Sequence, residues 1–177
     1  MKILVATEKP FAKKAVDGIR QIVEGAGYEL ALLEKYTDKS ELLSAVADVD
    51  ALIIRSDKVT AEVIEAARNL KIVVRAGAGY DNVDLAAATA RGIVVMNTPG
   101  QNSNAVAELA LAMMIFMARN GFTPGTGSEI QGKTLGIHAY GNVGRLVGRK
   151  GKAMGMNVIA YDPFITCLLY TSDAADA

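Results

Sequence analysis

The sequence predicts an α/β protein in which a doubly wound parallel sheet is followed by the beginning of a second α/β domain. Short runs rich in Val, Ile and Leu alternate with helical patterns over residues 1–100, which is typical of parallel strands joined through helices. A long apolar segment and a loop with four glycines come next. A second strand–helix–strand pattern starts at Lys133. The expected domains are therefore residues 1–100 and 101–166.

The elements of the first domain are expected from the local spacing of apolar residues. The strand segments are short and mostly apolar, which suits strands buried on both faces. They cover residues 2–6, 28–33, 51–54, 72–74 and 93–96. The helical segments cover residues 10–24, 40–47, 61–68 and 85–90.

Turn and capping residues support these boundaries. Pro10 suits the first turn of a helix, where its missing N–H costs no hydrogen bond. Ser40 and Thr60 are suitable N-caps, because their hydroxyls accept hydrogen bonds from backbone N–H groups. Gly27 and Gly92 suit helix ends, which often need a left-handed residue.

The second domain opens with a helix that ends near Asn120 and that Ser103 or Asn104 can cap. Residues 105–118 are apolar nearly all round, with Glu108 as the exception. A helix without a polar face must be covered on every side. Burial between domains or subunits and burial in the core of one monomer both remain open.

The composition indicates a soluble globular protein. Apolar residue types make up 51% of the sequence, and 19 basic residues balance 19 acidic ones, so no net field gathers a polyanion. The single cysteine makes neither a disulfide framework nor a metal site by itself. No apolar run reaches the roughly 20 residues that a bilayer requires. We expect a cytoplasmic protein without a nucleic acid, membrane or metal partner.

The C-terminal residues 167–177 resemble the translation of an adapter used to build sequencing libraries. They show no hydrophobic period on which to fold. We therefore leave them, with Cys167, out of the fold prediction. This interpretation also predicts that the natural sequence is cut short after Thr166.

Residues 134–161 predict a dinucleotide-binding βαβ unit. A glycine-rich turn follows the first strand and opens the helix, and an acidic residue ends the next strand about 20 positions later. Glycines let the backbone approach the pyrophosphate and let the helix pack on the strand, while the helix N-terminus attracts phosphates. The expected cofactor contacts are Tyr140, Gly141, Asn142, Val143, Gly144 and Asp162.

Two positions qualify this motif. Ala139 stands where the usual pattern has its first glycine, and we expect a negative φ there, because a positive φ would cost an alanine roughly 1–2 kcal/mol. Asp162 is expected to accept hydrogen bonds from the ribose hydroxyls. Its charge would repel a 2′-phosphate, so NAD is predicted over NADP. An ordinary tight strand–helix turn is the alternative to a cofactor site.

His138 is the single histidine of the chain and a natural candidate for a catalytic base. It lies in the strand before the turn, between the apolar residues Ile137 and Ala139. Groups within strands seldom reach a substrate, which loops more often bind. We therefore predict a structural histidine.

Several motifs together are similar to the D-isomer-specific 2-hydroxyacid dehydrogenases. They are Arg-Ala-Gly-Ala-Gly-Tyr-Asp-Asn-Val-Asp at 75–84, Met-Asn-Thr-Pro at 96–99, Asn-Ser at 102–103 and Ala-Glu at 107–108. The resemblance extends from Met1 to Phe164. It implies a flavodoxin-like substrate domain and an incomplete Rossmann domain that binds NAD. It also implies a homodimer formed through helix 103–120 and a small 2-hydroxy or 2-oxo acid as the substrate.

The resemblance further assigns substrate contacts to the first domain. Consecutive N–H groups at a strand end form a concavity that binds anions, and glycines allow close approach. Ala78 stands where some relatives carry a threonine near the cofactor, so only a backbone contact is expected there. A topological turn and a solvated arginine are the structural alternatives. The expected substrate contacts are Arg55, Ser56, Gly77, Ala78 and Gly79.

The family's catalytic histidine, its acidic partner and its arginine fall downstream of the position of Asp162. The resemblance therefore implies an oxidoreductase whose present chain is an inactive fragment, with residues 121–166 poorly stable alone. A phosphorylated D-2-hydroxyacid is favoured as the substrate, and glyoxylate or hydroxypyruvate remains open. A non-catalytic protein that senses NAD on the same fold is the second alternative.

Overall fold

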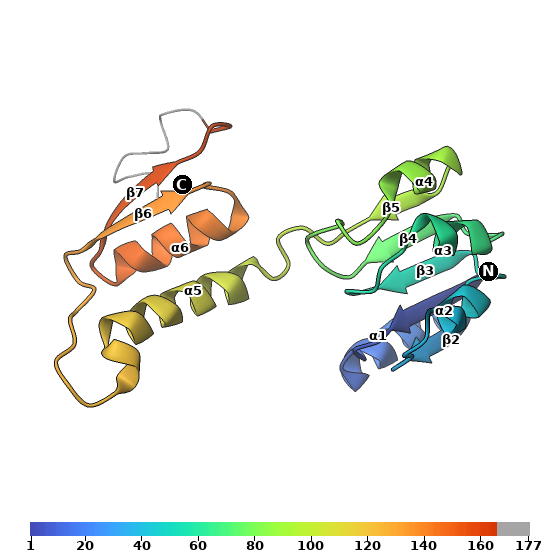
Figure 1. The fold of residues 1–177 in the computed structure, drawn as a ribbon, viewed down its shortest axis with the longest axis horizontal. Helices are drawn as coiled ribbons and strands as arrows, with labels where there is room; N and C mark the ends of the chain where they lie inside the picture. The colour runs from blue at the N-terminus through green and yellow to red at the C-terminus, as the bar shows by residue number, and fades with distance from the viewer. Residues whose placement is uncertain (166–177) are drawn as a thin grey trace. The chain divides into compact units, whose positions relative to one another are not determined.

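The computed structural model describes residues 1–165, and the predicted adapter tail lies outside the described residues. The chain forms two compact units that divide between Pro99 and Gly100 (Figure 1). Within the described range, no helix combines the length and the apolar character that a membrane span requires.

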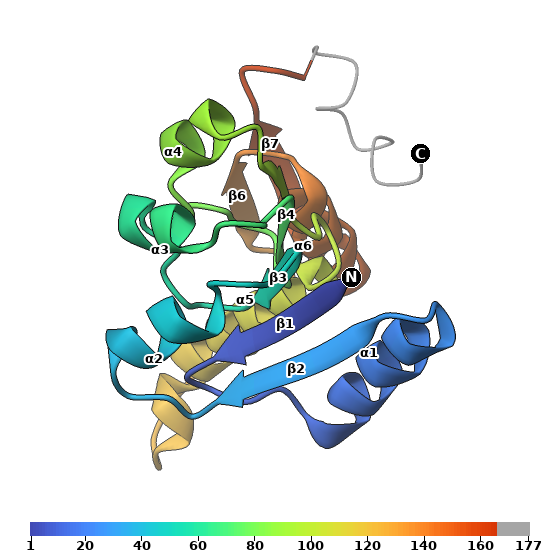
Figure 2. The ribbon, with the colours of Figure 1, turned by 90° about the vertical axis from the view of Figure 1, so that its right-hand side faces the viewer.

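The first unit is a five-stranded parallel sheet with the order β2-β1-β3-β4-β5. Figure 2 shows α2, α3 and α4 on one face and α1 on the other, which confirms the predicted doubly wound sheet. The strands are β1 (Lys2–Thr7), β2 (Glu29–Glu34), β3 (Ala51–Ile54), β4 (Ile72–Arg75) and β5 (Val94–Met96). The helices are α1 (Lys13–Gly25), α2 (Lys39–Ala45), α3 (Ala61–Ala66) and α4 (Leu85–Ala90).

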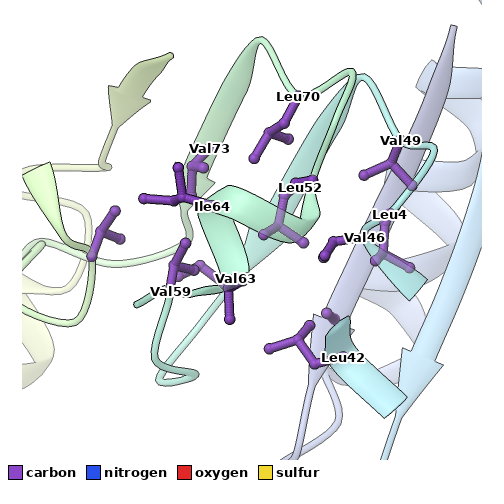
Figure 3. Packing of buried hydrophobic residues seen from close by; sticks show 14 of the residues in the cluster. Leu4, Leu42, Val46, Val49, Leu52, Val59, Val63, Ile64, Leu70 and Val73 are labelled. Atoms are coloured by element: carbon purple, nitrogen blue, oxygen red, sulfur yellow. The ribbon is translucent and has the colours of Figure 1, made fainter. Parts of the chain in front are cut away.

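The core of this unit lies between the sheet and α2, α3 and α4 (Figure 3). Leu52 and Val73 point to this face from neighbouring strands and are completely buried, as is Val63 of α3. Side chains alternate along a strand, so Ile53 and Val74 point to the opposite face, where they are half-buried. Burial of each large side chain contributes about 1.5–3 kcal/mol.

Two predicted helix starts are wrong. Pro10 lies in the loop after β1, and α1 begins at Lys13, because the intervening residues carry the chain from the strand end onto the sheet face. Ser40 lies inside α2 and does not cap it. Asp38 is the cap: its carboxylate accepts a hydrogen bond from the Ser40 N–H at 2.7 Å, and Glu41 reaches back to the Asp38 N–H at 3.2 Å. This reciprocal capping box satisfies more N–H groups than a serine alone can.

The other predicted caps have mixed outcomes. Thr60 is the N-cap residue of α3, but its hydroxyl makes no capping hydrogen bond. Gly27 and Gly92 follow α1 and α4 with φ of 76° and 66°, as the sequence predicts. Asp84, which the sequence interpretation passed over, caps α4 by accepting a hydrogen bond from the Ala87 N–H at 2.9 Å.

The second unit packs two helices on a two-stranded parallel sheet. Ala107, Leu135 and Val147 are its buried apolar centre. The predicted βαβ pattern is present with both strands at the expected residues. The elements are α5 (Ser103–Ala118), a 3-10 turn at Asn120–Phe122, β6 (Thr134–His138), α6 (Asn142–Ala153) and β7 (Asn157–Tyr161).

The apolar helix α5 buries one face and exposes the other. Ala107 and Leu111 are buried, whereas Leu109, Met113 and Met117 are 60%, 59% and 73% exposed. The predicted caps are also wrong, because Asn102 holds the N-cap position and makes no side-chain cap. In the chain alone, therefore, α5 is covered on only part of its circumference.

Candidate acid-binding and nucleotide-binding sites

The first candidate site lies where β3 and β4 end. These strands pair in parallel with Ile54 opposite Arg75, so the residues that follow them meet at one edge of the sheet. The Arg75 Nε donates a hydrogen bond to the backbone oxygen of Arg55 at 2.8 Å. The structure thus brings the predicted residues Arg55 and Ser56 to the same edge as Gly77.

Gly77 has a specific packing role beside Arg75. A Cβ atom added at Gly77 would lie 1.8 Å from the Arg75 Nη1. The guanidinium group therefore lies directly over the Gly77 backbone, where no side chain fits without displacing it. Arg75 is a candidate for anion binding that the sequence interpretation missed, because it was used only as the first residue of the motif at 75–84 and given no role.

The loop after β4 exposes part of the predicted anion-binding concavity. The Gly77 N–H donates to the Arg75 oxygen at 2.8 Å and is therefore already used. The Ala78 oxygen accepts a hydrogen bond from Asn97 Nδ2 at 2.7 Å, which orients the loop. Within residues 1–165, the N–H groups of Ala78 and Gly79 have no acceptor. They are the donors that this loop can offer to a carboxylate.

A buried carboxylate anchors the Arg55–Ser56 segment. Asp57 is 4% exposed, and its Oδ1 accepts hydrogen bonds from the Tyr36 hydroxyl and the Glu8 N–H, each at 2.8 Å. Its Oδ2 accepts from the Arg55 N–H at 3.3 Å. Burial, and then the hydrogen bond to Asp57, raise the pKa of Tyr36 above its usual value, so the phenol remains a donor at neutral pH. Sequence reasoning missed this network, because its members are distant along the chain.

The second candidate site is the turn between β6 and α6. Gly141 is the N-cap residue, and the N–H groups of Asn142 and Val143 have no acceptor within the described residues. A Cβ atom at Gly141 would meet nothing within 4 Å, so the space beside the turn is open. A helix N-terminus with free N–H groups and open space suits a diphosphate.

Gly144 allows α6 to approach the strand end. A Cβ atom there would lie 2.3 Å from the backbone oxygen of Ala139. That distance is far below any van der Waals contact, so any side chain would push the helix away from the turn. Gly144 thus has the packing role that the sequence predicts.

Asp162 lies at this turn. Its Oδ2 accepts a hydrogen bond from the Tyr140 N–H at 2.7 Å, and its Oδ1 accepts from the Phe164 N–H at 2.9 Å. The carboxylate is therefore held beside the glycine-rich segment. A carboxylate oxygen can accept more than one hydrogen bond, so the ribose hydroxyls of a dinucleotide are chemically suitable partners.

Tyr140 contributes to the site through its backbone. Its side chain is 5% exposed, and its hydroxyl lies beside Gly148, where an added Cβ would be 3.0 Å away. The ring therefore packs under α6, and its N–H already orients Asp162. A direct side-chain contact to a cofactor does not fit this geometry.

The expectation of a negative φ at Ala139 is wrong. Its φ is 80°, although its N–H still continues the strand ladder to the Tyr161 oxygen at 2.7 Å. The chain must leave the ladder and turn at once into α6, and this requires a left-handed residue. Alanine is strained in that region by roughly 1–2 kcal/mol.

His138 is the exposed last residue of β6, and its ring stacks on Tyr161 with centroids 5.5 Å apart. It makes no hydrogen bond to an acidic residue within the described range. Nor do the described residues hold a group of three potential metal ligands. The structural interpretation of His138 remains a prediction.

The fold and these two candidate sites define a class: an α/β protein with free N–H groups at a strand edge and a glycine-rich turn that opens a helix. The chain belongs to the D-isomer specific 2-hydroxyacid dehydrogenase family, because the model of that family's catalytic domain matches residues 4–176. The matched range includes most of the predicted adapter tail and so does not separate that tail from the rest.

The chain is also similar in sequence to individual 2-hydroxyacid dehydrogenases. The chain is 43% identical over 149 residues to a hydroxypyruvate reductase of Thermotoga maritima, covering 76% of this chain and 49% of the relative. It is 42% identical over 180 residues to a D-3-phosphoglycerate dehydrogenase of Archaeoglobus fulgidus, covering 94% and 33%. The chain therefore spans half or less of the length of these curated relatives.

A solved structure supports the fold. The NAD+-bound 3-phosphoglycerate dehydrogenase of Entamoeba histolytica is 54% identical and superimposes with a TM-score of 0.89. The match covers 94% of this chain and 55% of that one. This similarity extends across both units and confirms the predicted α/β fold class.

Proposed function

We propose that this chain is part of an oxidoreductase that transfers a hydride between NAD and a D-2-hydroxyacid. The observation that carries the proposal is the β6–α6 turn, where free N–H groups and open space lie beside Asp162. The NAD+-bound relative from Entamoeba histolytica supports the choice of cofactor. When bound, NAD supplies the nicotinamide carbon that accepts a hydride from the substrate.

The chain's own residues would hold this cofactor at defined points. The N–H groups of Asn142 and Val143 would donate to the diphosphate, and the bare backbone of Gly141 would allow it to approach. Asp162 would accept hydrogen bonds from the adenine ribose. The same carboxylate would repel a 2′-phosphate, which favours NAD over NADP.

The acid would bind at the edge formed by β3 and β4. The Ala78 and Gly79 N–H groups would hold one carboxylate, and the guanidinium groups of Arg55 and Arg75 would attract a second anionic group. Two arginines at this edge favour a phosphorylated acid, and 3-phosphoglycerate is the proposed substrate. The similarity to a hydroxypyruvate reductase keeps hydroxypyruvate as the second candidate.

We further propose that the 177-residue chain itself does not turn over substrate. Hydride transfer requires a group that moves the hydroxyl proton, and a positioned base typically contributes 10²–10⁴-fold, as an order of magnitude. His138 stacks on Tyr161 and forms no ion pair with an acidic residue among the described residues. A protein that only senses NAD would use the same cofactor contacts, so turnover by the whole protein separates the two functions.

The exposed face of α5 supports a homodimer. Leu109, Met113 and Met117 lie along one side of the helix. Exposing this much contiguous apolar surface to water is unfavourable, and such patches mark interaction surfaces. A second copy that packs the same face against it would bury all three residues. We therefore propose that residues 103–120 form the dimer interface of the whole protein.

The cofactor proposal is tested by calorimetric titration of the chain with NAD. Gly141→Ala should weaken NAD binding by tenfold or more, as an order of magnitude, because its methyl group occupies the space of the diphosphate. The thermal midpoint should stay unchanged, since that methyl group meets no protein atom. Gly18→Ala in α1, which also points into open space, is the matched control. Equal NAD affinity in all three proteins would refute the proposal.

A further inference from the structure

A cavity opens in the first unit, on the side of Ser56 that faces α2. It has a volume of about 500 Å³ and is lined by segments that follow β1, β2 and β3. In the strand order β2-β1-β3-β4-β5, all strands are parallel, but β2 is added on one side of β1 and β3 to β5 on the other, so the order of strand addition reverses between β1 and β3. Open parallel sheets bind ligands in the crevice at the carboxyl ends of strands at such a reversal, and the volume suits a small molecule.

The side chains of this cavity favour an anion. Lys58 lies in its wall, is exposed, and forms no ion pair within the described residues. Lys39 also lines the cavity, and its ammonium group forms an ion pair with Glu62 of α3. Thr37 and Ser56 add hydroxyl donors, and Glu8 is the acidic residue of the lining. Of the two lysines in the wall, Lys58 is therefore the one that no carboxylate pairs among the described residues.

The nearby carboxylate of Asp57 does not neutralise Lys58 through direct contact. Both of its oxygens accept hydrogen bonds from Tyr36, Glu8 and Arg55, and the residue is 4% exposed. These hydrogen bonds occupy the carboxylate, and Asp57 is not among the residues that line the cavity. Lys58, the next residue, is left to face the solvent and any ligand.

An unsatisfied polar atom lies in the same wall. The Thr60 hydroxyl oxygen is buried and has no hydrogen-bond partner, although the residue lines the cavity. Buried polar groups are almost always paired, and an exception calls for a missing partner. Because Thr60 lines the cavity, a molecule bound there is a candidate for that partner.

We propose that this cavity binds the phosphate or equivalent anionic group of a small organic acid, with Lys58 as its principal charge contact. Ser56 couples the cavity to the acid-binding edge, because it directly follows Arg55, whose backbone oxygen is held by Arg75. The bound group belongs either to the far end of the substrate, in which case the cavity and not the Arg55–Arg75 pair holds that end, or to a separate effector. Anion binding follows from the cavity itself, and only its assignment to the substrate rests on the proposed function.

The experiment is an amide NMR titration of the ¹⁵N-labelled 177-residue chain with inorganic phosphate, 3-phosphoglycerate and D-glycerate. Phosphate should shift the amides of Thr37, Ser56 and Lys58. Lys58→Gln should raise the phosphate Kd by about fivefold or more. Lys13→Gln is the matched control, since Lys13 pairs with Asp17 on α1; it should leave the Kd unchanged.

The organic ligands distinguish the two sources. If 3-phosphoglycerate shifts Ser56 and Gly79 with one Kd that Lys58→Gln weakens, the cavity holds the substrate's second anionic group. If 3-phosphoglycerate and D-glycerate shift Gly79 with the same Kd, and saturating 3-phosphoglycerate leaves the phosphate-induced shifts of Ser56 and Lys58 unchanged, the cavity is an effector site. Either result supports the proposed anion site.

Two results would overturn it: no shift at the cavity up to roughly 20 mM phosphate, beyond the millimolar range of a weak site, or equal Kd values for the Lys58 and Lys13 variants. Shifts confined to Arg55 and Arg75 would also overturn it, because they would place the anion at the arginines. NAD titrated into the same sample reports on residues 141–144. If NAD causes no shifts at residues 141–144, the result counts against the proposed function and leaves the result for the cavity unchanged.

Discussion

The first unit shields its parallel sheet with helices on both faces, whereas the second unit leaves most of its two-stranded sheet open. Leu52 and Val73 in the first sheet are completely buried, but Ile159 and Tyr161 in the second are 59% and 60% exposed. The candidate sites differ in the same way. The acid-binding edge is anchored by the buried Asp57, while the nucleotide turn depends on glycines that let α6 lie close to β6. Local backbone shape thus supports the second site, and the surrounding core supports the first.

The largest expected difference between the units concerns their cores. Leu52→Ala should cost about 3 kcal/mol and Leu135→Ala about 2 kcal/mol, because Leu135 sits in the smaller cluster. Amide hydrogen exchange measures each unit separately. The first substitution should accelerate exchange in β3 by about 100-fold and leave β6 unchanged. Equal acceleration in both strands would show that the units unfold together.

Gly144→Ala should destabilise the second unit by about 2 kcal/mol. The added methyl group would lie 2.3 Å from the Ala139 oxygen, and a backbone atom yields less readily than a side chain. The loss of stability is measured by urea unfolding of the chain, and amide hydrogen exchange in β6 assigns that loss to the second unit. Because Gly141→Ala is expected to leave stability intact, the pair separates packing from cofactor binding. If Gly144→Ala leaves the free energy of unfolding unchanged, α6 can move away from the turn without destabilising the unit.

Ala139→Gly should stabilise the second unit by about 0.5–1 kcal/mol. Glycine removes the strain of a φ of 80° but adds entropy to the unfolded chain, so only part of the relief remains. At the acid-binding edge of the first unit, Gly77 and Gly79 have ordinary φ values; the non-glycine left-handed residue of that unit, Lys35 with φ of 59°, directly follows β2. A higher thermal midpoint with unchanged β3 exchange is the expected result; a lower midpoint contradicts it.

The smallest expected effect is a pH dependence confined to the first unit. The backbone hydrogen bond from Ser40 lowers the pKa of Asp38 below its ordinary value of 3.8. A lowered folded pKa contributes stability above pH 3.8, and this contribution is lost as the pH falls further through the folded value. Asp38→Asn retains a cap but not the charge. Its urea midpoint should approach that of the parent chain at pH 3, and a constant difference from pH 7 to pH 3 would contradict the assignment.

The sequence predicts the strands of the first sheet within two residues at either end, because apolar β-branched runs and glycine stops are local signals. Helix starts are less secure. Pro10 and Ser40 are good local candidates, but the loop after β1 and the Asp38–Glu41 pair decide where α1 and α2 begin. The choice between competing caps depends on chain direction, which short windows do not contain.

The site residues also fall into two groups: those that a local spacing predicts and those that only strand pairing brings together. The glycine-rich turn and Asp162 follow a fixed spacing, so their proximity is readable from the sequence. Arg75 and Asp57 have no such spacing to the residues they contact. Arg75 reaches the Arg55 oxygen 20 positions away, and Asp57 accepts from Glu8 49 positions away. Parallel strand pairing creates these contacts.

The sequence by itself therefore determined the order of strands and helices, the family, and the turn that suits a dinucleotide. Tertiary structure decided that Asp57 is buried, that a cavity with Lys58 in its wall lies beside Ser56, and that α5 keeps an exposed apolar face. It also decided the positive φ of Ala139. The physical reason is that periodicity and turn chemistry act between neighbours along the chain. Burial, ion pairing and backbone strain instead depend on which distant segments the sheet brings together.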